Sequence, residues 1–267
     1  MVENLLLVGC GKMGSAMLTR WLQSDRFKQT HFTVIDPSFE HQTASLTIHR
    51  STDELAANYK PDIILFAIKP QKMQRAVPIY ADRFGKHPIY ISIAAGTTLG
   101  ALSMLLCEGA QVIRAMPNTP ALVGAGITVM CPCPRISPET EDKVTILMEA
   151  IGSVAWIHDE SLMDAVTALS GSGPAYVFLF LESLAEAGVQ AGLPVNMARR
   201  LALQTILGSG ILAERTREDF SILRENVTSP GGTTEAAMSV LMHKNAFKEL
   251  LMEAFRKAAA RSCELSS

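Results

Sequence analysis

The sequence contains few of the features that mark secreted proteins and metal sites. It has five cysteines, an odd number, and no C-x-x-C pair: Cys10, Cys107, Cys131, Cys133 and Cys263. Scattered cysteines favour a reducing compartment over a disulfide framework. Cys131 and Cys133 have no second pair or histidine cluster beside them. We therefore expect no metal site and interpret both as small apolar residues of a loop.

Charge of one sign and aromatic residues are also scarce. The chain has 24 Lys and Arg against 26 Asp and Glu, a net charge of −2, and only 6% of its residues are aromatic. A near-neutral chain offers no electrostatic attraction to DNA or to an anionic membrane. Few aromatic side chains leave few platforms on which bases can stack. We therefore expect neither a nucleic acid nor a membrane as partner.

Long hydrophobic runs are absent. The apolar run at residues 5–8 ends at Gly9, and the run at residues 175–181 is little longer. A signal peptide needs about 7–15 apolar residues, and a transmembrane helix needs about 20. The sequence therefore predicts a soluble, cytoplasmic protein.

What the chain has is enough length and apolar content for a sizeable core. Its 267 residues, 48% of them hydrophobic, suit one large domain or two modest ones. Short apolar runs predict strands at residues 5–8, 31–35, 62–67, 88–93, 111–116, 127–130 and 153–157. Amphipathic segments predict helices at residues 12–23, 53–58, 71–84 and 98–106. Strands that alternate with helices indicate a parallel sheet covered on both faces.

The pattern changes at about Asp159. No strand-like run follows, and helix-like segments occupy residues 162–169, 174–191, 195–214, 218–226, 234–243 and 246–264. We predict an α/β domain at residues 1–158, followed by an all-helical domain at residues 159–267.

A G-x-G-x-x-G sequence follows the first predicted strand and opens the first predicted helix: Gly9-Cys10-Gly11-Lys12-Met13-Gly14. In dinucleotide-binding folds these glycines allow a tight turn and a close approach of the pyrophosphate. The N–H groups at the start of the helix then bind the phosphates. We predict that the α/β domain is Rossmann-type and that these six residues bind NAD(P). The alternative is a plain strand–helix turn that is rich in small residues.

Asp36 ends the second predicted strand, about 20 residues beyond the last of these glycines. An acid at this position accepts hydrogen bonds from the ribose 2′-OH of NAD. It would repel the 2′-phosphate of NADP, so Asp36 favours NADH as the cofactor. A simpler interpretation is that Asp36 only caps the next turn.

Other candidate cofactor residues lie at the ends of predicted strands, where open α/β sheets bind ligands. Ala67, Lys69 and Pro70 lie at the end of the strand predicted at residues 62–67, and Asn118 follows the strand at residues 111–116. We predict that these four residues contact the cofactor. Lys69 is otherwise an ordinary solvated lysine, and Asn118 is otherwise part of a common turn.

Two segments of the helical half place hydroxyl groups and glycines just before a predicted helix. Residues 169–176 include Ser172, and residues 227–234 include Ser229, Gly232, Thr233 and Thr234. Such turns expose backbone N–H groups that bind a small carboxylate without a lysine or arginine. The alternative is that each segment is only a helix N-cap with a hinge.

The chain has no lysine between Lys143 and Lys244. A Rossmann dehydrogenase of hydroxyacids typically uses a lysine of its helical domain as acid or base, so the absence disfavours that class. No Ser-His-Asp order and no H-E-x-x-H sequence indicates a hydrolase.

Over nearly its whole length, the chain resembles the pyrroline-5-carboxylate reductases. The resemblance lies in residues 9–14, 67–70, 92–96 and 116–120, and most specifically in the combination of residues 170–176 with residues 228–234. It implies hydride transfer from NAD(P)H to the C=N carbon of 1-pyrroline-5-carboxylate, giving L-proline in the last step of proline biosynthesis. It also implies a homodimer through interlocked helical domains, or a larger homo-oligomer, in which each active site borrows residues from the partner.

The resemblance also implies roles for individual residues. Ser229, Gly232, Thr233 and Thr234 would hold the substrate carboxylate, and the hydroxyl of Thr234 would lie nearest the ring nitrogen as the catalytic group. Because a protonated imine is already an electrophile, positioning of the reactants would supply much of the catalysis. The family commonly uses NADPH and often has an Asn-Arg pair after the second strand, where this chain has Asp36 and a proline.

A second hypothesis is a regulatory protein that senses NAD(P) without turnover. The intact segment at residues 227–234 favours the enzyme, because a sensor of the nucleotide has no need of a substrate site.

Overall fold

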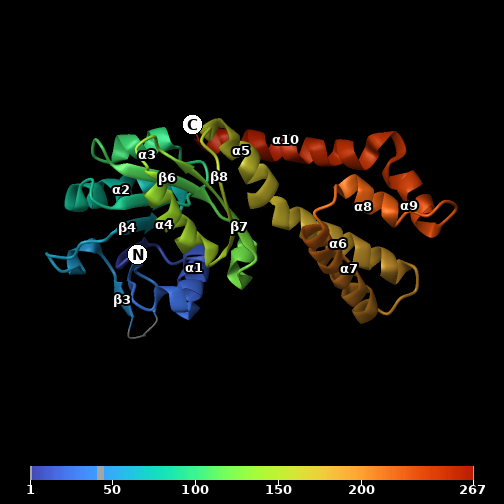
Figure 1. The fold of residues 1–267 in the computed structure, drawn as a ribbon, viewed down its shortest axis with the longest axis horizontal. Coiled ribbons are helices and arrows are strands. Elements are labelled where there is room, and N and C mark those ends of the chain that lie inside the picture. The colour runs from blue at the N-terminus through green and yellow to red at the C-terminus, as the bar shows by residue number, and fades with distance from the viewer. Residues whose placement is uncertain (1, 41–44, 267) are drawn as a thin grey trace. The chain divides into compact units, whose positions relative to one another are not determined.

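The computed structural model describes residues 2–40 and 45–266, which form two compact units. The first unit contains the chain up to Ser172 together with the residues from Ala258 onward. The second contains Gly173–Lys257. We describe each unit by itself (Figure 1).

The compact division falls later in the chain than the predicted division after residue 158. The last strand ends at Trp156, close to the predicted position. The residues that follow it pack back onto the sheet, where Met163 is buried against Val129 and Cys131. The first unit therefore includes this short segment as well as the sheet.

The first unit is built on one eight-stranded sheet in the order β3-β2-β1-β4-β5-β6-β7-β8. The strands are β1 (Asn4–Val8), β2 (His31–Ile35), β3 (Leu46–His49), β4 (Ile63–Phe66), β5 (Ile89–Ser92), β6 (Gln111–Met116), β7 (Gly126–Pro132) and β8 (Gly152–Trp156). All neighbouring strands are parallel except β6 and β7. The seven predicted strands are present, with ends that differ by at most a few residues.

Three details of the sheet differ from the prediction. β3 was not predicted, because its sequence Leu-Thr-Ile-His is short and half polar at the edge of the sheet. β7 runs antiparallel to β6, because the connection between them holds only a 3₁₀ turn at Thr119–Val123 and is too short for a helical crossover. Cys131, which we expected in a loop, lies buried in β7.

Helices cover both faces of this sheet: α1 (Lys12–Gln23) and α4 (Pro138–Glu149) on one, and α2 (Pro70–Phe84) and α3 (Leu99–Leu105) on the other. The prediction missed α4, although its N-cap Ser137, whose side chain accepts from the Thr140 N–H, and its first-turn proline are helix-start signals. The helix predicted at residues 53–58 is wrong. Only a 3₁₀ turn forms there, because so short a segment does not repay the cost of nucleating a helix.

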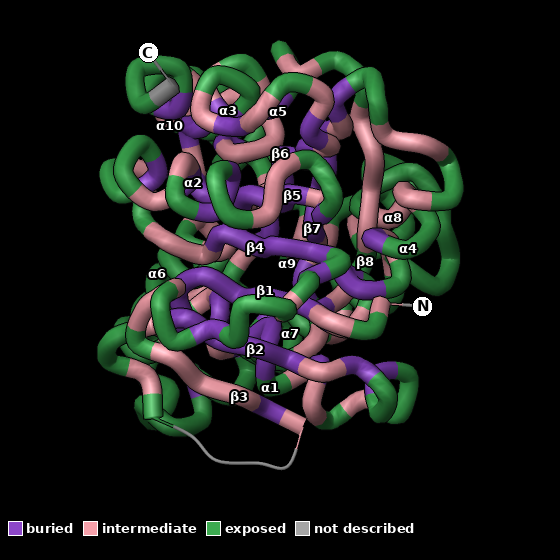
Figure 2. Tube along the Cα trace, turned by 90° about the vertical axis from the view of Figure 1, so that its left-hand side faces the viewer, coloured by how far each residue is buried: buried purple, intermediate pink, exposed green. Residues whose placement is uncertain are grey.

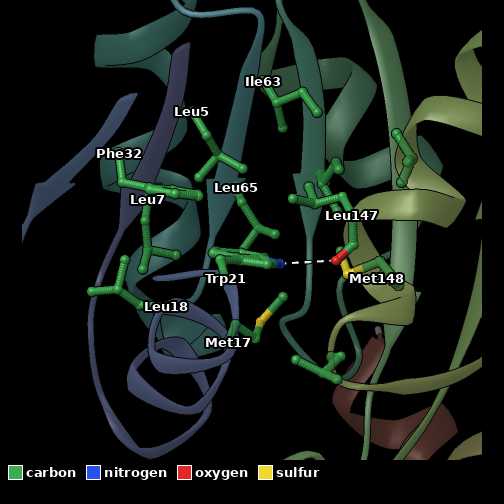
Figure 3. Close-up of a cluster of buried hydrophobic side chains, with 14 of the residues drawn as sticks. Leu5, Leu7, Met17, Leu18, Trp21, Phe32, Ile63, Leu65, Leu147 and Met148 are labelled. Atoms are coloured by element: carbon green, nitrogen blue, oxygen red, sulfur yellow. Dashed lines mark hydrogen bonds between the residues drawn. The ribbon is translucent and has the colours of Figure 1, made fainter. Parts of the chain in front are cut away.

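The core lies on both faces of the sheet because successive side chains of each strand point to opposite faces. Leu5 and Leu7 pack against α1 and α4, whereas Leu6 packs against α2 and α3. Trp21 of α1 stacks on Phe32, and its indole N–H donates a hydrogen bond of 2.8 Å to the Leu147 carbonyl of α4 (Figure 3). The inner strands and β2 are accordingly buried along most of their length, whereas the edge strands β3 and β8 are mostly half-buried (Figure 2).

The chain after the sheet is helical, as predicted, but it is not regular at first. A short helix α5 (Met163–Val166) is followed by a π-helical turn at Thr167–Gly171, where one continuous helix was expected. The second unit then contains α6 (Gly173–Gln190), α7 (Val195–Thr216), α8 (Phe220–Asn226) and α9 (Thr233–Leu241). The last helix, α10 (Ala246–Ser266), begins in the second unit and ends in the first.

The second unit leaves most of its apolar side chains exposed. Within Gly173–Lys257, all of which the structure describes, only Ala198 and Ala202 are buried. In α6 the four consecutive residues from Val177 to Phe180 are 44%, 62%, 63% and 40% exposed. Successive helical residues point about 100° apart, so this one turn of α6 is apolar and exposed all the way round, whereas the following turns carry Glu182 and Glu186. None of the described helices is long and apolar enough to cross a membrane.

Candidate active site

The first unit contains the crevice at which open α/β sheets bind nucleotides. β1 lies between β2 and β4, and Val8 at the end of β1 is paired with Phe66 at the end of β4. The chain order reverses at β1, because β2 and β3 lie on one side and β4 to β8 on the other. The loops after β1 and β4 therefore leave the sheet side by side and frame a crevice between them.

The turn at residues 9–14 requires glycine for two separate reasons. Gly9 has a φ of +88°, and a Cβ there would lie 2.6 Å from Ile68 Cγ2 and 2.8 Å from the Ala67 carbonyl oxygen. A Cβ on Gly14 would lie 2.6 Å from the Gly9 carbonyl oxygen. Around Gly11, in contrast, nothing lies within 4 Å of the position a Cβ would take. Gly9 and Gly14 thus serve the packing of the turn, whereas Gly11 leaves space beside it.

That space lies at the start of α1, where the missing side chain of Gly11 leaves the backbone open to an approaching group. Gly11 is the N-cap of α1, and no side chain caps the helix there. Lys12 is exposed and Met13 is half-buried at the same end. The uncapped N–H groups carry the positive end of the helix dipole, which favours a phosphate group. The residues present therefore fit the dinucleotide that the sequence predicts, and the first turn of α1 would hold its phosphates.

Asp36 is already engaged within the turn. Its Oδ2 accepts a hydrogen bond of 2.8 Å from the Cys10 N–H, and its Oδ1 accepts from the N–H and the hydroxyl of Ser38. Burial raises the pKa of the carboxyl, but these hydrogen bonds and the nearby charge of Lys72 lower it further, so the pKa lies below its ordinary value. Asp36 is thus ionised at neutral pH. It performs the capping role that we considered as the simpler interpretation, and any ribose hydroxyl would share its oxygens.

Cys10 contributes to the turn through its backbone. Burial, followed by the nearby charge of Asp36, raises the pKa of its thiol to about 12. The thiol is therefore protonated and unreactive at neutral pH. The predicted role of Cys10 at the cofactor would use its main chain.

Ala67, Lys69 and Pro70 belong to the connection between β4 and α2, beside the loop after β1. The Ala67 N–H donates a hydrogen bond of 2.8 Å to the Val8 carbonyl, which fixes the loop after β4 beside the loop after β1. Lys69 is the exposed N-cap of α2, and Pro70 is its first residue. The structure thus brings Ala67 to the glycine-rich turn, and Lys69 and Pro70 follow it in the same loop.

Asn118 lies at the same edge of the sheet, but its side chain is hydrogen-bonded to other residues of the protein. Its Oδ1 accepts a hydrogen bond of 2.9 Å from the Ile127 N–H, and its Nδ2 donates one of 3.2 Å to the Ser170 carbonyl. Both polar atoms of the amide therefore have partners before any cofactor is bound.

α6 begins at Gly173, close to the predicted helix start, but the segment before it is not an open turn. The Ser172 N–H donates a hydrogen bond of 2.9 Å to the Thr167 carbonyl, which continues the π-helical turn into α6. The prediction of an exposed anion-binding turn is therefore wrong here, because that N–H group is used within the helix. Ser172 is half-buried and its hydroxyl has no hydrogen-bond partner among the described residues, so it is the group this residue can offer to a substrate.

The segment at residues 227–234 does form a helix start with open N–H groups. Gly231 has a φ of +71°, and Gly232, the N-cap of α9, donates its N–H to the Ser229 carbonyl. None of the described residues accepts a hydrogen bond from the N–H groups of Thr233 and Thr234. The turn therefore offers two N–H donors and two hydroxyl groups, and it belongs to the second unit.

Sequence reasoning missed one feature in each unit. The carboxylate of Glu235 accepts the Gly231 N–H at 2.7 Å and braces the turn; an acid three residues after an N-cap is a signal that would have found it. Arg114, buried on β6, donates to Glu160 at 2.9 Å, and the same oxygen of Glu160 accepts the Leu99 N–H at 2.7 Å. No local pattern marks that pair.

Among the described residues, no group of three or more His, Cys, Asp or Glu side chains could hold a metal ion.

Two family models match the chain. Residues 160–265 match the model of pyrroline-5-carboxylate reductase dimerisation, and residues 4–96 match the model of NADP oxidoreductase, coenzyme F420-dependent. The second match covers the glycine-rich turn, and the first covers the helical segment that contains the Thr234 turn.

Individual proteins extend the similarity to the whole chain. A pyrroline-5-carboxylate reductase of Synechocystis sp. is 39% identical over 265 residues, which cover 98% of both chains. The structure of the enzyme from Coxiella burnetii superposes with a TM-score of 0.90 at 31% identity and covers 99% of both chains. The Plasmodium falciparum pyrroline carboxylate reductase, solved with NADP bound, superposes with a TM-score of 0.88 at 32% identity and covers 99% of this chain and 98% of that one. This protein therefore belongs to the pyrroline-5-carboxylate reductase family.

Proposed function

We propose that this protein reduces 1-pyrroline-5-carboxylate to L-proline with NAD(P)H. The observation that carries the proposal is the start of α9, where the N–H groups and hydroxyls of Thr233 and Thr234 have no partner among the described residues. Membership of the reductase family supports it. The cofactor, when bound, supplies the hydride that adds to the C=N carbon.

The turn at residues 229–234 has the chemistry to hold a small carboxylate. The N–H groups of Thr233 and Thr234 lie at the positive end of the α9 dipole, which favours an anion. Glu235 braces Gly231, so the donors are arranged before substrate arrives. We assign the hydroxyl of Thr234 to the ring nitrogen, and those of Ser229 and Ser172 to the substrate.

Little acid catalysis is needed from the protein. The protonated imine is already an electrophile; its carbon gains the hydride, and its nitrogen keeps its proton and becomes the amine of proline. The residues of the site therefore bind and orient, which can supply several kcal/mol of the barrier. This agrees with a site that has neither histidine nor lysine in its substrate turn.

For the cofactor we propose a preference for NADH. The ionised Asp36 would repel the 2′-phosphate of NADPH, and it lies beside the turn that would hold the pyrophosphate. The bound NADP of the Plasmodium falciparum enzyme is a property of that protein.

We also propose a homodimer formed through the helical unit, which can assemble further into a larger homo-oligomer. The unit buries few side chains, and α6 exposes four consecutive apolar residues, Val177 to Phe180. A second copy of this chain would cover these faces. The scattered cysteines support the reducing cytoplasm as its compartment.

The test is a spectrophotometric assay of NADH and NADPH oxidation, with and without 1-pyrroline-5-carboxylate. We expect oxidation only when the imine is present, with proline as the product. Binding of the cofactor without oxidation would instead support the alternative, a nucleotide sensor without turnover.

A further inference from the structure

We propose that Asn118 is a positioning residue: its side-chain amide holds the π-helical turn at Thr167–Gly171, and with it Ser172, against the end of β6, and it does not bind the cofactor. The kinetic part of this inference rests on the proposed function. The structural part does not, because Asn118, Ile127, Met116 and the π-helical turn all lie in the first unit; only Pro174, which follows the turn, belongs to the second.

The orientation of the Asn118 amide follows from its two partners. The Ile127 N–H can only donate, so it must face the amide oxygen, at 2.9 Å. The Ser170 carbonyl can only accept, so it must face the amide NH₂, at 3.2 Å. Asn118 therefore ties the first residues of β7 to a turn that follows it by about fifty positions in the chain.

Pro174 removes the α-helical partner of the Ser170 carbonyl. In an α-helix this carbonyl would accept the N–H of the residue four positions later, which is Pro174. Proline has no N–H to donate. The carbonyl would be left without that bond, and the Asn118 amide supplies a donor in its place.

A second contact docks the same turn. A Cβ on Gly171 would lie only 2.5 Å from Met116 Cε, so the turn lies directly against the last residue of β6. Asn118 and Met116 thus hold neighbouring residues of the turn from one strand end. Ser172 follows at once, and its N–H is bound to Thr167 within the turn. The position of the Ser172 hydroxyl relative to the sheet edge therefore depends on the Asn118 hydrogen bond.

Two variants of Asn118 distinguish the role of its side-chain oxygen from the role of its NH₂ group. Asn118→Asp keeps an oxygen for the Ile127 N–H but places a second oxygen against the Ser170 carbonyl, whereas Asn118→Ala removes both bonds. In hydrogen–deuterium exchange, we expect Asn118→Asp to speed exchange in residues 163–172 and to leave residues 126–132 unchanged. Asn118→Ala should speed exchange in both segments.

Pro174→Ala provides the matched control. It restores an N–H that the Ser170 carbonyl can accept, so Asn118→Asp should disturb exchange at residues 163–172 less in the Pro174→Ala background. Equal effects in the two backgrounds would overturn the argument from proline. Unchanged exchange at residues 163–172 in both single variants would overturn the positioning role itself.

Kinetics distinguish a positioning role from cofactor binding, because the two roles change different KM values. Losing one hydrogen bond that orders Ser172 should raise KM for the imine about three- to tenfold in Asn118→Asp, with KM for the cofactor within about twofold. A larger rise in KM for the cofactor than for the imine would show that Asn118 binds the cofactor and would overturn the inference. If the wild-type protein does not turn over the imine, the proposed function fails, and the exchange experiment still decides the structural role.

Discussion

The carboxylate of Asp36 accepts a hydrogen bond of 2.8 Å from the backbone N–H of Cys10 and thereby ties the end of β2 to the glycine-rich turn after β1. The residue that the sequence assigns to the ribose is thus also a structural part of the turn that would hold the pyrophosphate. Substitution of Asp36 should therefore alter both the choice of cofactor and the stability of the turn, and the two effects can be measured separately.

We expect Asp36→Ser to shift the preference from NADH toward NADPH, because it removes the charge that repels a 2′-phosphate. Asp36→Asn, which keeps the shape and loses the charge, should shift the preference in the same direction. The measurement is the ratio of kcat/KM for the two cofactors in each protein. An unchanged ratio would leave Asp36 as a turn residue only.

Stability should depend on pH through the same carboxyl. Its folded pKa is lowered, so the ionised form stabilises the folded chain above the unfolded pKa of about 4, and this contribution is lost as pH falls through the folded pKa. The Tm of wild type should therefore exceed that of Asp36→Asn by the largest amount near neutral pH, and this difference should shrink in strong acid. A difference that grows on acidification would contradict the assignment.

The glycines of the turn should fall into two classes. Gly11→Val should fold normally and lose cofactor affinity, because its side chain would enter open space at the start of α1. Gly14→Val should lose about 1–3 kcal/mol of stability, because its side chain would meet the Gly9 carbonyl. Cofactor titration and thermal unfolding of both variants distinguish the classes. A folded Gly11→Val protein with wild-type affinity would refute the cofactor site.

Thr234→Ala should impair the reaction without weakening cofactor binding. It removes one hydroxyl from the α9 turn and leaves the backbone N–H groups in place. Losing one hydrogen bond to a charged group costs about 1.5–3 kcal/mol, or roughly ten- to two-hundredfold in kcat/KM for the imine. Steady-state kinetics and cofactor titration test this. Wild-type kcat/KM, or equal losses for imine and cofactor, would remove Thr234 from the substrate site.

A charge on α6 should disrupt the oligomer. Phe178 of α6 is 62% exposed in the single chain and lies in the helix that we expect a second copy to cover. Phe178→Asp should therefore lower the mass measured by light scattering, because a buried, unpaired charge is costly at an interface. The control is Met104→Asp, since Met104 is 83% exposed but lies on α3 of the other unit. Identical masses for both variants and wild type would argue against this interface.

Local sequence patterns determined the α/β half, the helical half and the glycine-rich turn. Strand runs and amphipathic helices are short-range patterns, and Gly9 and Gly14 are needed for backbone reasons that act within one strand–turn–helix unit. The open start of α9 was predictable for the same reason, because N-cap chemistry depends on only a few consecutive residues.

Only the tertiary structure decided which polar groups are already used. Asn118 and Asp36 both looked available for a cofactor, yet each is bonded to a group far away in the chain, Ser170 and Cys10. The antiparallel β7 and the π-helical turn were likewise not predictable. Buried polar groups must find partners, and which partner is near depends on how the strands are ordered in the sheet, which no local pattern specifies.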